Sequence, residues 1–326
     1  MIALIIGSGI AMVFTMVMMP LFIRLLTLKQ YGQVVRDDGP TSHATKSGTP
    51  TMGGVIIIAA VILSYFITHG LLALLGRPSA GVSASGLLVL LLFAGMGLVG
   101  FLDDFIKIAK KRSLGLRAWQ KIVLQAVVGI GFAVLALNFP NAQGLTPAST
   151  AISFLRDTSI DLAFAGPLFG LILFVLWSNL IVTATTNGVN LTDGLDGLAT
   201  GAAIMVFGAY TLIGIWQQNQ ACGIHEAKNV CYTVRDPMDL ALLGAIFCGA
   251  LIGFLWWNAK PAKIFMGDTG SLAIGGAIAA FAILSRTQIL LLVLAGLFVI
   301  IALSVISMVI ARETTSRDAR SFADGA

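Results

Sequence analysis

Long apolar segments alternate with short polar ones along almost the whole chain. Each apolar segment has about 20 residues, the length of α-helix that crosses roughly 30 Å of hydrocarbon. The segments follow one another so closely that no room remains for a separate soluble domain. The pattern therefore predicts an all-α fold, a polytopic integral membrane protein with about nine transmembrane helices. The expected spans are 1–27, 52–75, 85–102, 121–137, 162–183, 198–216, 239–257, 271–284 and 289–311.

In this interpretation, residues 1–311 form a single transmembrane helical domain with functional loops on its cytoplasmic side. Residues 312–326 form a polar cytoplasmic tail, which we expect to be disordered or bound to the membrane surface. The first span has no Lys or Arg ahead of its apolar run, and that run is too long for the core of a signal peptide. We therefore interpret the first span as a retained helix.

Composition and charge support a membrane location and indicate an orientation. Hydrophobic residues make up 57% of the chain and charged residues only 11%, against about 25% charged in soluble domains. With the N-terminus outside, fifteen of the 20 Lys and Arg residues fall on the inner side. The positive-inside rule favours this orientation. The net charge of +5 then reflects topology, and we expect no nucleic-acid partner.

Two of the three cysteines, Cys222 and Cys231, lie in the same external loop. An oxidising compartment would allow a disulfide between them, and two unpaired thiols are the alternative. Cys248 lies within an apolar span. The sequence leaves both states of the external pair open.

Acidic residues gather at the inner ends of the predicted helices. Asp103 and Asp104 end the third span, and Asp268 precedes the eighth. Proton-coupled and cation-coupled carriers usually place an ionisable residue or a broken helix near the middle of the membrane. This distribution disfavours a transporter or flippase, which remains one of the alternatives.

The pair of aspartates in GFLDDFIK is followed by a basic run that includes Lys107 and Lys111. Mg²⁺ prefers carboxylate oxygens and takes its remaining ligands from water and substrate phosphates, so one or two aspartates suffice to bind it. The basic residues could bind a polyphosphate beside it. Taken alone, the segment is equally well explained as the ordinary charged end of a transmembrane helix.

The segment TTNGVNLTDGLDGLATG concentrates polar residues between two apolar helices. Asp196 could cap the helix that starts near residue 198, but capping leaves Asn187, Asn190 and Asp193 unexplained. We therefore interpret this loop as functional.

In the segment GDTGS, Asp268 opens a further helix. The free backbone N–H groups of a helix N-terminus attract phosphate, and an aspartate there can hold a cation that bridges two phosphates. Capping by Asp268 or Thr269 is compatible with that role.

The first inner loop, VVRDDGPTSHATKSGTPTMGG, is rich in Gly and Pro and adds His43, Lys46 and Thr51. Taken alone, His43 is better explained as a solvated loop residue. The predicted topology nevertheless places all four polar segments on one face of the membrane, whereas unrelated polar residues would be scattered. The shared face indicates a single site.

These four segments, DGPTSHATKSGTPTMGG, GFLDDFIK, NGVNLTDGLDGLA and WWNAKPAKIFMGDTGSLA, resemble the bacterial phospho-N-acetylmuramoyl-pentapeptide transferases, also called translocase I. The resemblance extends in order and spacing to about Arg286. GTPTMGG and FMGDTGSLA favour this family over the related N-acetylglucosamine-1-phosphate transferases, which remain an alternative.

The resemblance implies a ten-helix enzyme of the bacterial cytoplasmic (inner) membrane, with its active site on the cytoplasmic face and Mg²⁺ as cofactor. It implies UDP-N-acetylmuramoyl-pentapeptide and undecaprenyl phosphate as substrates, and lipid I and UMP as products in peptidoglycan synthesis. A homodimer is a possible assembly of the chain.

Carried over by resemblance, the essential aspartates of the family correspond to Asp103, Asp104 and Asp268, and Asp268 corresponds to the Mg²⁺ ligand. Asp103 or Asp104 could attack as a covalent nucleophile, or the lipid phosphate could attack directly, and the sequence does not separate these routes. Phe265 offers a face for stacking on uracil. The positions expected to bind substrate are Lys46, Thr51, Lys107, Lys111, Lys121, Asn187, Asn190, Asp193, Asp196, Asn258 and Phe265.

The chain departs from the family pattern after about Ser307. The family has a histidine-rich loop and a tenth helix, whereas this sequence contains only His43, His69 and His225. We expect the lack of these two elements to slow turnover. A truncated, non-catalytic paralogue that still binds lipid and nucleotide is a further alternative.

Overall fold

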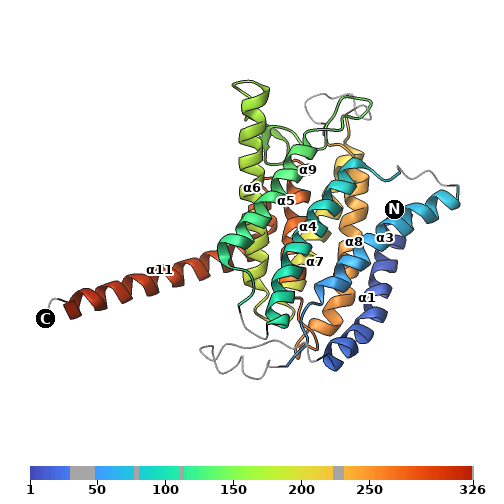
Figure 1. The fold of residues 1–326 in the computed structure, drawn as a ribbon. Helices are drawn as coiled ribbons and strands as arrows, with labels where there is room; N and C mark the ends of the chain where they lie inside the picture. The colour runs from blue at the N-terminus through green and yellow to red at the C-terminus, as the bar shows by residue number, and fades with distance from the viewer. Residues whose placement is uncertain (30–47, 77–80, 111–113, 223–230, 325–326) are drawn as a thin grey trace.

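The computed structural model describes residues 1–29, 48–76, 81–110, 114–222 and 231–324, with side chains described as far as residue 311. Within these ranges the chain is a bundle of long helices with one small two-stranded sheet (Figure 1). The all-α prediction is confirmed.

Eight helices in the described part of the chain are long and apolar enough to cross a membrane. They correspond in order to the first eight predicted spans, so the chain is a polytopic integral membrane protein. Proline occupies the first turn of two of them, where its missing N–H costs no hydrogen bond. The eight are α1 (Ile2–Leu28), α3 (Gly54–Leu74), α4 (Ala84–Ala109), α5 (Ala118–Ala136), α6 (Pro167–Thr192), α7 (Leu198–Asn219), α8 (Pro237–Asn258) and α9 (Gly267–Leu284).

Two helices extend well beyond their predicted inner ends. Helix α4 continues to Ala109 and α6 to Thr192, past the expected ends at 102 and 183. The polar residues there stay helical because they bond within their helix: the Asn187 amide, for example, donates to the Thr183 carbonyl at 2.8 Å. Polar residues that the sequence placed in a loop, Asn187 and Asn190 among them, are therefore helical.

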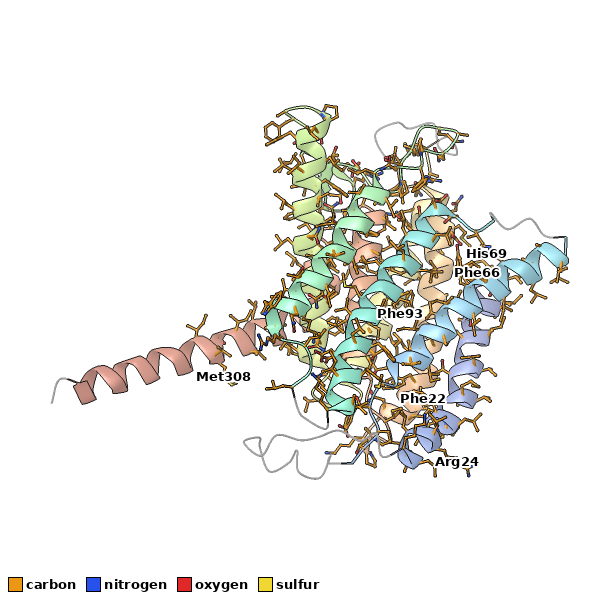
Figure 2. All side chains as sticks on the ribbon, viewed as in Figure 1. Phe22, Arg24, Phe66, His69, Phe93 and Met308 are labelled. Carbon is orange, nitrogen blue, oxygen red and sulfur yellow. A yellow bond between two sulfur atoms is a disulfide. The ribbon has the colours of Figure 1, made fainter. Side chains whose placement is uncertain are left out.

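The predicted ninth span, 289–311, is not one continuous helix. A short helix α10 (Leu291–Leu294) is separated by Ala295 from α11 (Gly296–Asp324). Helix α11 projects sideways from the bundle (Figure 1), and Figure 2 shows Met308 well away from the other helices. The backbone of α11 remains helical to Asp324, so residues 312–324 of the predicted polar tail are helical.

Helix α9 lies at the centre of the bundle and packs against α3, α4 and α6. It is apolar on all sides and nearly every residue is buried, as expected for an interior helix. Small residues allow the close approach: a Cβ atom on Gly100 of α4 would lie 2.1 Å from the Asp268 carbonyl oxygen. The inner end of α4 is therefore held directly against the start of α9.

The end of the bundle opposite Asp268 carries the sheet, an antiparallel hairpin of β1 (Ala151–Ser153) and β2 (Asp157–Asp161). The Arg286 guanidinium joins this hairpin to the end of α9 through Asp157, with 2.8 Å between Nη1 and Oδ2. Burial lowers the pKa of Arg286, and the Asp157 carboxylate opposes that effect. Figure 2 shows Arg24 and His69 near opposite ends of the bundle.

A disulfide joins Cys222 and Cys231, so of the two states that the sequence left open the structure contains the bonded one. Cys248, the remaining cysteine, is a free thiol on α8, within the apolar span that the sequence predicted.

Candidate active site

Three aspartates from two helices meet at one end of the bundle. Asp103 and Asp104 lie near the end of α4, and Asp268 lies in the first turn of α9. One carboxylate oxygen from each lies within 4.8 Å of the others. Asp103 and Asp104 are each only 3% exposed, so their charges are poorly screened by solvent. Such a cluster requires cations or strong hydrogen-bond donors nearby.

The start of α9 is shaped by a glycine that no other residue could replace without strain. Gly267 has φ +74°, in the left-handed region. A Cβ atom at this position would lie 2.7 Å from Asp104 Oδ2 and 2.9 Å from Thr51 Oγ1. No side chain caps α9, so the alternative role of Asp268 or Thr269 as a helix cap is not seen. The Asp268 carboxylate lies in the cluster instead.

Two lysines neutralise the acidic cluster. Lys107 Nζ lies 2.6 Å from Asp103 Oδ2, 2.9 Å from Asp268 Oδ2 and 3.6 Å from Asp104 Oδ1. Lys121, at the start of α5, lies 2.7 Å from the same Asp268 oxygen. The ammonium of Lys107 therefore contacts all three carboxylates at once.

Backbone and hydroxyl donors fix the two α4 carboxylates. The Thr269 backbone N–H and hydroxyl both donate to Asp104 Oδ2, at 2.9 and 2.8 Å. The Leu116 N–H donates to Asp103 Oδ1 at 2.8 Å. The sequence considered Thr269 only as a helix cap; its position next to Asp268 was the signal for this second role.

Asn190, near the end of α6, completes the surroundings of Asp268. Its Nδ2 donates to Asp268 Oδ1 at 2.7 Å and to the Ser271 hydroxyl at 2.8 Å. Ser271 in turn donates to the Gly267 carbonyl at 3.0 Å. Both oxygens of Asp268 thus have partners, a lysine pair on Oδ2 and an amide on Oδ1. The sequence did not single out Ser271, three residues after Asp268.

The donor set of this cluster fits Mg²⁺. Three carboxylates within 4.8 Å supply the hard oxygen ligands that Mg²⁺ prefers, and one or two such ligands are enough when phosphates complete the coordination. The lysine ammonium among them already occupies a position where positive charge is stabilised. Asp268, with 17% of its side chain exposed, is the most accessible of the three.

A buried glutamine that the sequence did not identify supports a second asparagine of α6. The Asn187 amide nitrogen donates to Gln125 Oε1 at 3.0 Å as well as to the Thr183 carbonyl. Gln125 lies one helical turn beyond Lys121 on α5 and is fully buried. Its spacing of four residues from Lys121 was the available signal, since it places both on one helix face.

Three further predicted site residues lie in or beside the connections at this end. Asp193 follows the last residue of α6. Asp196 Oδ2 accepts from the Ala262 N–H at 3.2 Å, and the N-cap of α7 is Gly197, so Asp196 does not cap that helix. Asn258 is 2% exposed. Its Oδ1 accepts a hydrogen bond from Thr200 Oγ1 at 2.8 Å, and its Nδ2 donates to the Ile264 carbonyl at 3.0 Å. These two bonds join α7, α8 and the segment before α9.

Of the remaining residues predicted to bind substrate, two lie within the described part of the chain and two lie outside it. Thr51 lies beside Gly267 at the cluster. Phe265 is 7% exposed, and its backbone pairs with Pro50 and Gly53 at 2.9 Å each. Lys46 and Lys111 lie outside the described residues.

Comparisons with known proteins show which family the sequence matches. The model of glycosyl transferase family 4 matches residues 86–286, and phospho-N-acetylmuramoyl-pentapeptide-transferase signature 1 matches residues 46–58. The chain is 68% identical to the phospho-N-acetylmuramoyl-pentapeptide-transferase of Paenarthrobacter aurescens over 311 residues, 95% of this chain and 84% of that protein. It is 64% identical over 310 residues to the protein of that name from Micrococcus luteus, covering 95% and 82%. For Beutenbergia cavernae the identity is 55% over 305 residues, covering 93% and 83%.

Proposed function

Because the chain belongs to the phospho-N-acetylmuramoyl-pentapeptide-transferase family, we propose that it transfers phospho-N-acetylmuramoyl-pentapeptide from the UDP-linked donor to undecaprenyl phosphate. The products are lipid I and UMP. The observation that carries this proposal is that Lys107 and Lys121 contact a cluster of three aspartates at one end of the helix bundle. The chain that carries this cluster is 68% identical to a named transferase.

The reaction joins two anions that repel each other. An oxygen of the lipid phosphate attacks the phosphorus that carries the sugar, the bond from that phosphorus to the UMP oxygen breaks, and UMP leaves with the electron pair. The lysine ammonium groups neutralise the meeting phosphates, so the contribution of the protein is chiefly electrostatic and positional.

We favour direct attack by the lipid phosphate over a covalent aspartyl intermediate. Asp104 Oδ2 already accepts two hydrogen bonds from Thr269, and Asp103 is held by Lys107 and the Leu116 N–H. Carboxylates engaged in this way are weak nucleophiles. A phosphate monoester with a second pKa near 6 is mostly dianionic at pH 7, and it needs little help from a base.

The residues that would hold Mg²⁺ are Asp268 and, beside it, Asp103 and Asp104. The ion supplies charge neutralisation and orientation of phosphate oxygens when bound. Asn190 and Lys121 fix the Asp268 carboxylate, so they would set the direction of its metal-binding oxygen. We propose substrate contacts for Lys46, Thr51, Lys107, Lys111, Lys121, Asn187, Asn190, Asp193, Asp196, Asn258 and Phe265.

We also propose that the chain lies in the inner membrane with the acid cluster on the cytoplasmic side. The support is that Lys107, Lys110, Arg117 and Lys121 all lie at the cluster end of α4 and α5, as the positive-inside rule requires. The homodimer remains a prediction.

Exchange of labelled UMP into the UDP-linked donor tests this proposal, because it requires reversible phosphosugar transfer. Membranes containing the chain should catalyse exchange only with undecaprenyl phosphate and Mg²⁺, and EDTA should abolish it. Exchange with UDP-N-acetylglucosamine alone would favour the related transferases. Binding of nucleotide without exchange would favour the non-catalytic paralogue.

A further inference from the structure

Each carboxylate of the acid cluster has one oxygen that is held by a neutral donor of the surrounding structure. The donors are the Leu116 N–H for Asp103 Oδ1 at 2.8 Å, the Thr269 N–H and hydroxyl for Asp104 Oδ2 at 2.9 and 2.8 Å, and Asn190 Nδ2 for Asp268 Oδ1 at 2.7 Å. These donors orient the carboxylates. They do not supply the positive charge that buried carboxylates require.

The other oxygen of each carboxylate faces a single atom, Nζ of Lys107. This nitrogen lies 2.6 Å from Asp103 Oδ2, 2.9 Å from Asp268 Oδ2 and 3.6 Å from Asp104 Oδ1. A metal ion bound by the same three oxygens would take the place of the ammonium group. Two cations that share one buried place repel each other strongly, so the ion and the ammonium exclude each other there.

Lys107, rather than Lys121, is the lysine that can leave the carboxylates. Lys121 forms one ion pair within the described residues, to Asp268 Oδ2 at 2.7 Å. The side chain of Lys107 is 31% exposed, against 17% for Lys121, so Lys107 has the more open route to solvent. A lysine near the end of a helix can turn its ammonium toward water while its stem stays against the protein.

We infer that Lys107 is a built-in counter-ion of the acid cluster, and that Mg²⁺ binding displaces its ammonium from the three carboxylates toward the substrate phosphate. The inference rests on the proposed function, because it takes Mg²⁺ and a phosphate as the ligands of this site. The displaced ammonium remains tethered to α4 beside the cluster, so its charge becomes available to a phosphate once the ion is bound. By linkage, a phosphate that holds Lys107 away from the carboxylates strengthens metal binding by the same factor.

Acetylation of the unaltered full chain by a water-soluble amine-reactive reagent tests the displacement directly. Peptide mass spectrometry compares Lys107 with Lys110, an exposed lysine at the same helix end, in saturating Mg²⁺ and in EDTA at equal ionic strength. Mg²⁺ should raise the rate for Lys107 relative to Lys110 about tenfold, the factor that corresponds to one lost hydrogen bond between charged groups. Lys121 should change little, because it keeps its contact with Asp268. An unchanged or lower relative rate for Lys107 would overturn the inference.

Metal affinity without nucleotide gives a second readout, with Mn²⁺ as the probe because it takes the same oxygen ligands as Mg²⁺. Lys107→Met removes the ammonium and keeps an unbranched side chain. Lys110→Met removes the same charge from the C-cap of α4 and is the matched control. Titrations followed by the EPR signal of free Mn²⁺ should show about tenfold tighter binding by Lys107→Met than by the unaltered chain, and little change in Lys110→Met.

The outcomes separate this inference from the proposed function, because neither readout depends on turnover. An affinity of Lys107→Met that equals that of Lys110→Met, or is weaker than that of the unaltered chain, would overturn the inference and leave the Mg²⁺ site in place. Absence of Mn²⁺ binding by all three proteins would overturn the Mg²⁺ site and this inference with it. If Lys107→Met fails to fold, acetylation of the unaltered chain decides.

Discussion

At the scale of single residues, the account depends on a few polar side chains that each have more than one bonded partner. Lys107 contacts three carboxylates. The Asp268 carboxylate forms ion pairs with Lys107 and Lys121 and accepts a hydrogen bond from Asn190. The sequence identified these residues because acids and lysines are rare in a chain that is 57% hydrophobic. It did not identify Thr269, Ser271 and Gln125 as members of the site, since neutral polar residues are common in helices and only the packed structure shows their partners.

Asp268→Asn should lower transfer by about 10²- to 10³-fold, because the variant loses a charge aimed at the reacting phosphates. The protein should still insert, since the amide fits the same space. The measurement is turnover at equal membrane abundance. Asp161→Asn, on the hairpin at the other end, is the control and should leave turnover unchanged. Unchanged turnover in Asp268→Asn would remove this residue from the mechanism.

Gln125→Met should raise KM for the UDP-linked donor between about twofold and tenfold, the effect of one lost hydrogen bond. Methionine has a similar shape but offers no strong acceptor for the Asn187 amide, so Asn187 is no longer held. Gln125→Glu keeps an acceptor oxygen and should restore much of the affinity. If the Met and Glu variants change KM equally, Gln125 does not position Asn187.

At the scale of elements, the number and order of the first eight spans followed from hydrophobic length alone. Their inner ends did not, because α4 and α6 carry polar residues there that bond within their own helix and to partners on other helices. The division between α10 and α11 was also missed, since the sequence from 289 to 311 is almost entirely apolar and contains no proline to mark a break.

Helices α4 and α9 pack so closely at Gly100 that no side chain fits between them. Gly100→Ala should destabilise the protein by about 1–3 kcal/mol and lower transfer, because the new methyl group would meet the Asp268 carbonyl. Gly131→Ala is the matched control on α5, where a Cβ atom meets nothing within 4 Å, and it should be neutral or slightly stabilising. Thermal unfolding in detergent compares the two. Equal midpoints would show that the helices can separate at no cost.

The disulfide at the end of α7 should be detectable by intact mass. With and without reductant, the alkylation-trapped protein should differ by the labels on two thiols, Cys222 and Cys231. Transfer should change little on reduction, because these residues lie at the end opposite the acid cluster. Two labelled thiols before reduction would refute the bond.

At the scale of the whole molecule, the main finding is that residues far apart in the sequence meet at one end of the bundle. The sequence predicted this shared face from charge asymmetry, and the structure places Asp103, Lys121, Asn190 and Asp268 together there. The sideways direction of α11, which contacts α6, could not be predicted, since no local motif in the sequence from 289 to 311 indicates it.

Orientation can be tested with one cysteine at each end of the bundle. Lys110→Cys lies near the acid cluster and Gln143→Cys at the hairpin end, and both positions are exposed. In intact cells a membrane-impermeant maleimide should label Gln143→Cys, and it should label Lys110→Cys only after lysis. Labelling of Lys110→Cys in intact cells would reverse the proposed topology.

The most direct test of the central claim is the identity of the lipid product. Purified protein is supplied with undecaprenyl phosphate, Mg²⁺ and equal amounts of UDP-N-acetylmuramoyl-pentapeptide and UDP-N-acetylglucosamine, and the lipids are analysed by mass spectrometry. We predict lipid I as the product, in amounts that fall with Asp268→Asn. An N-acetylglucosamine-bearing lipid, or no lipid product from folded protein that binds the nucleotide, would contradict the account.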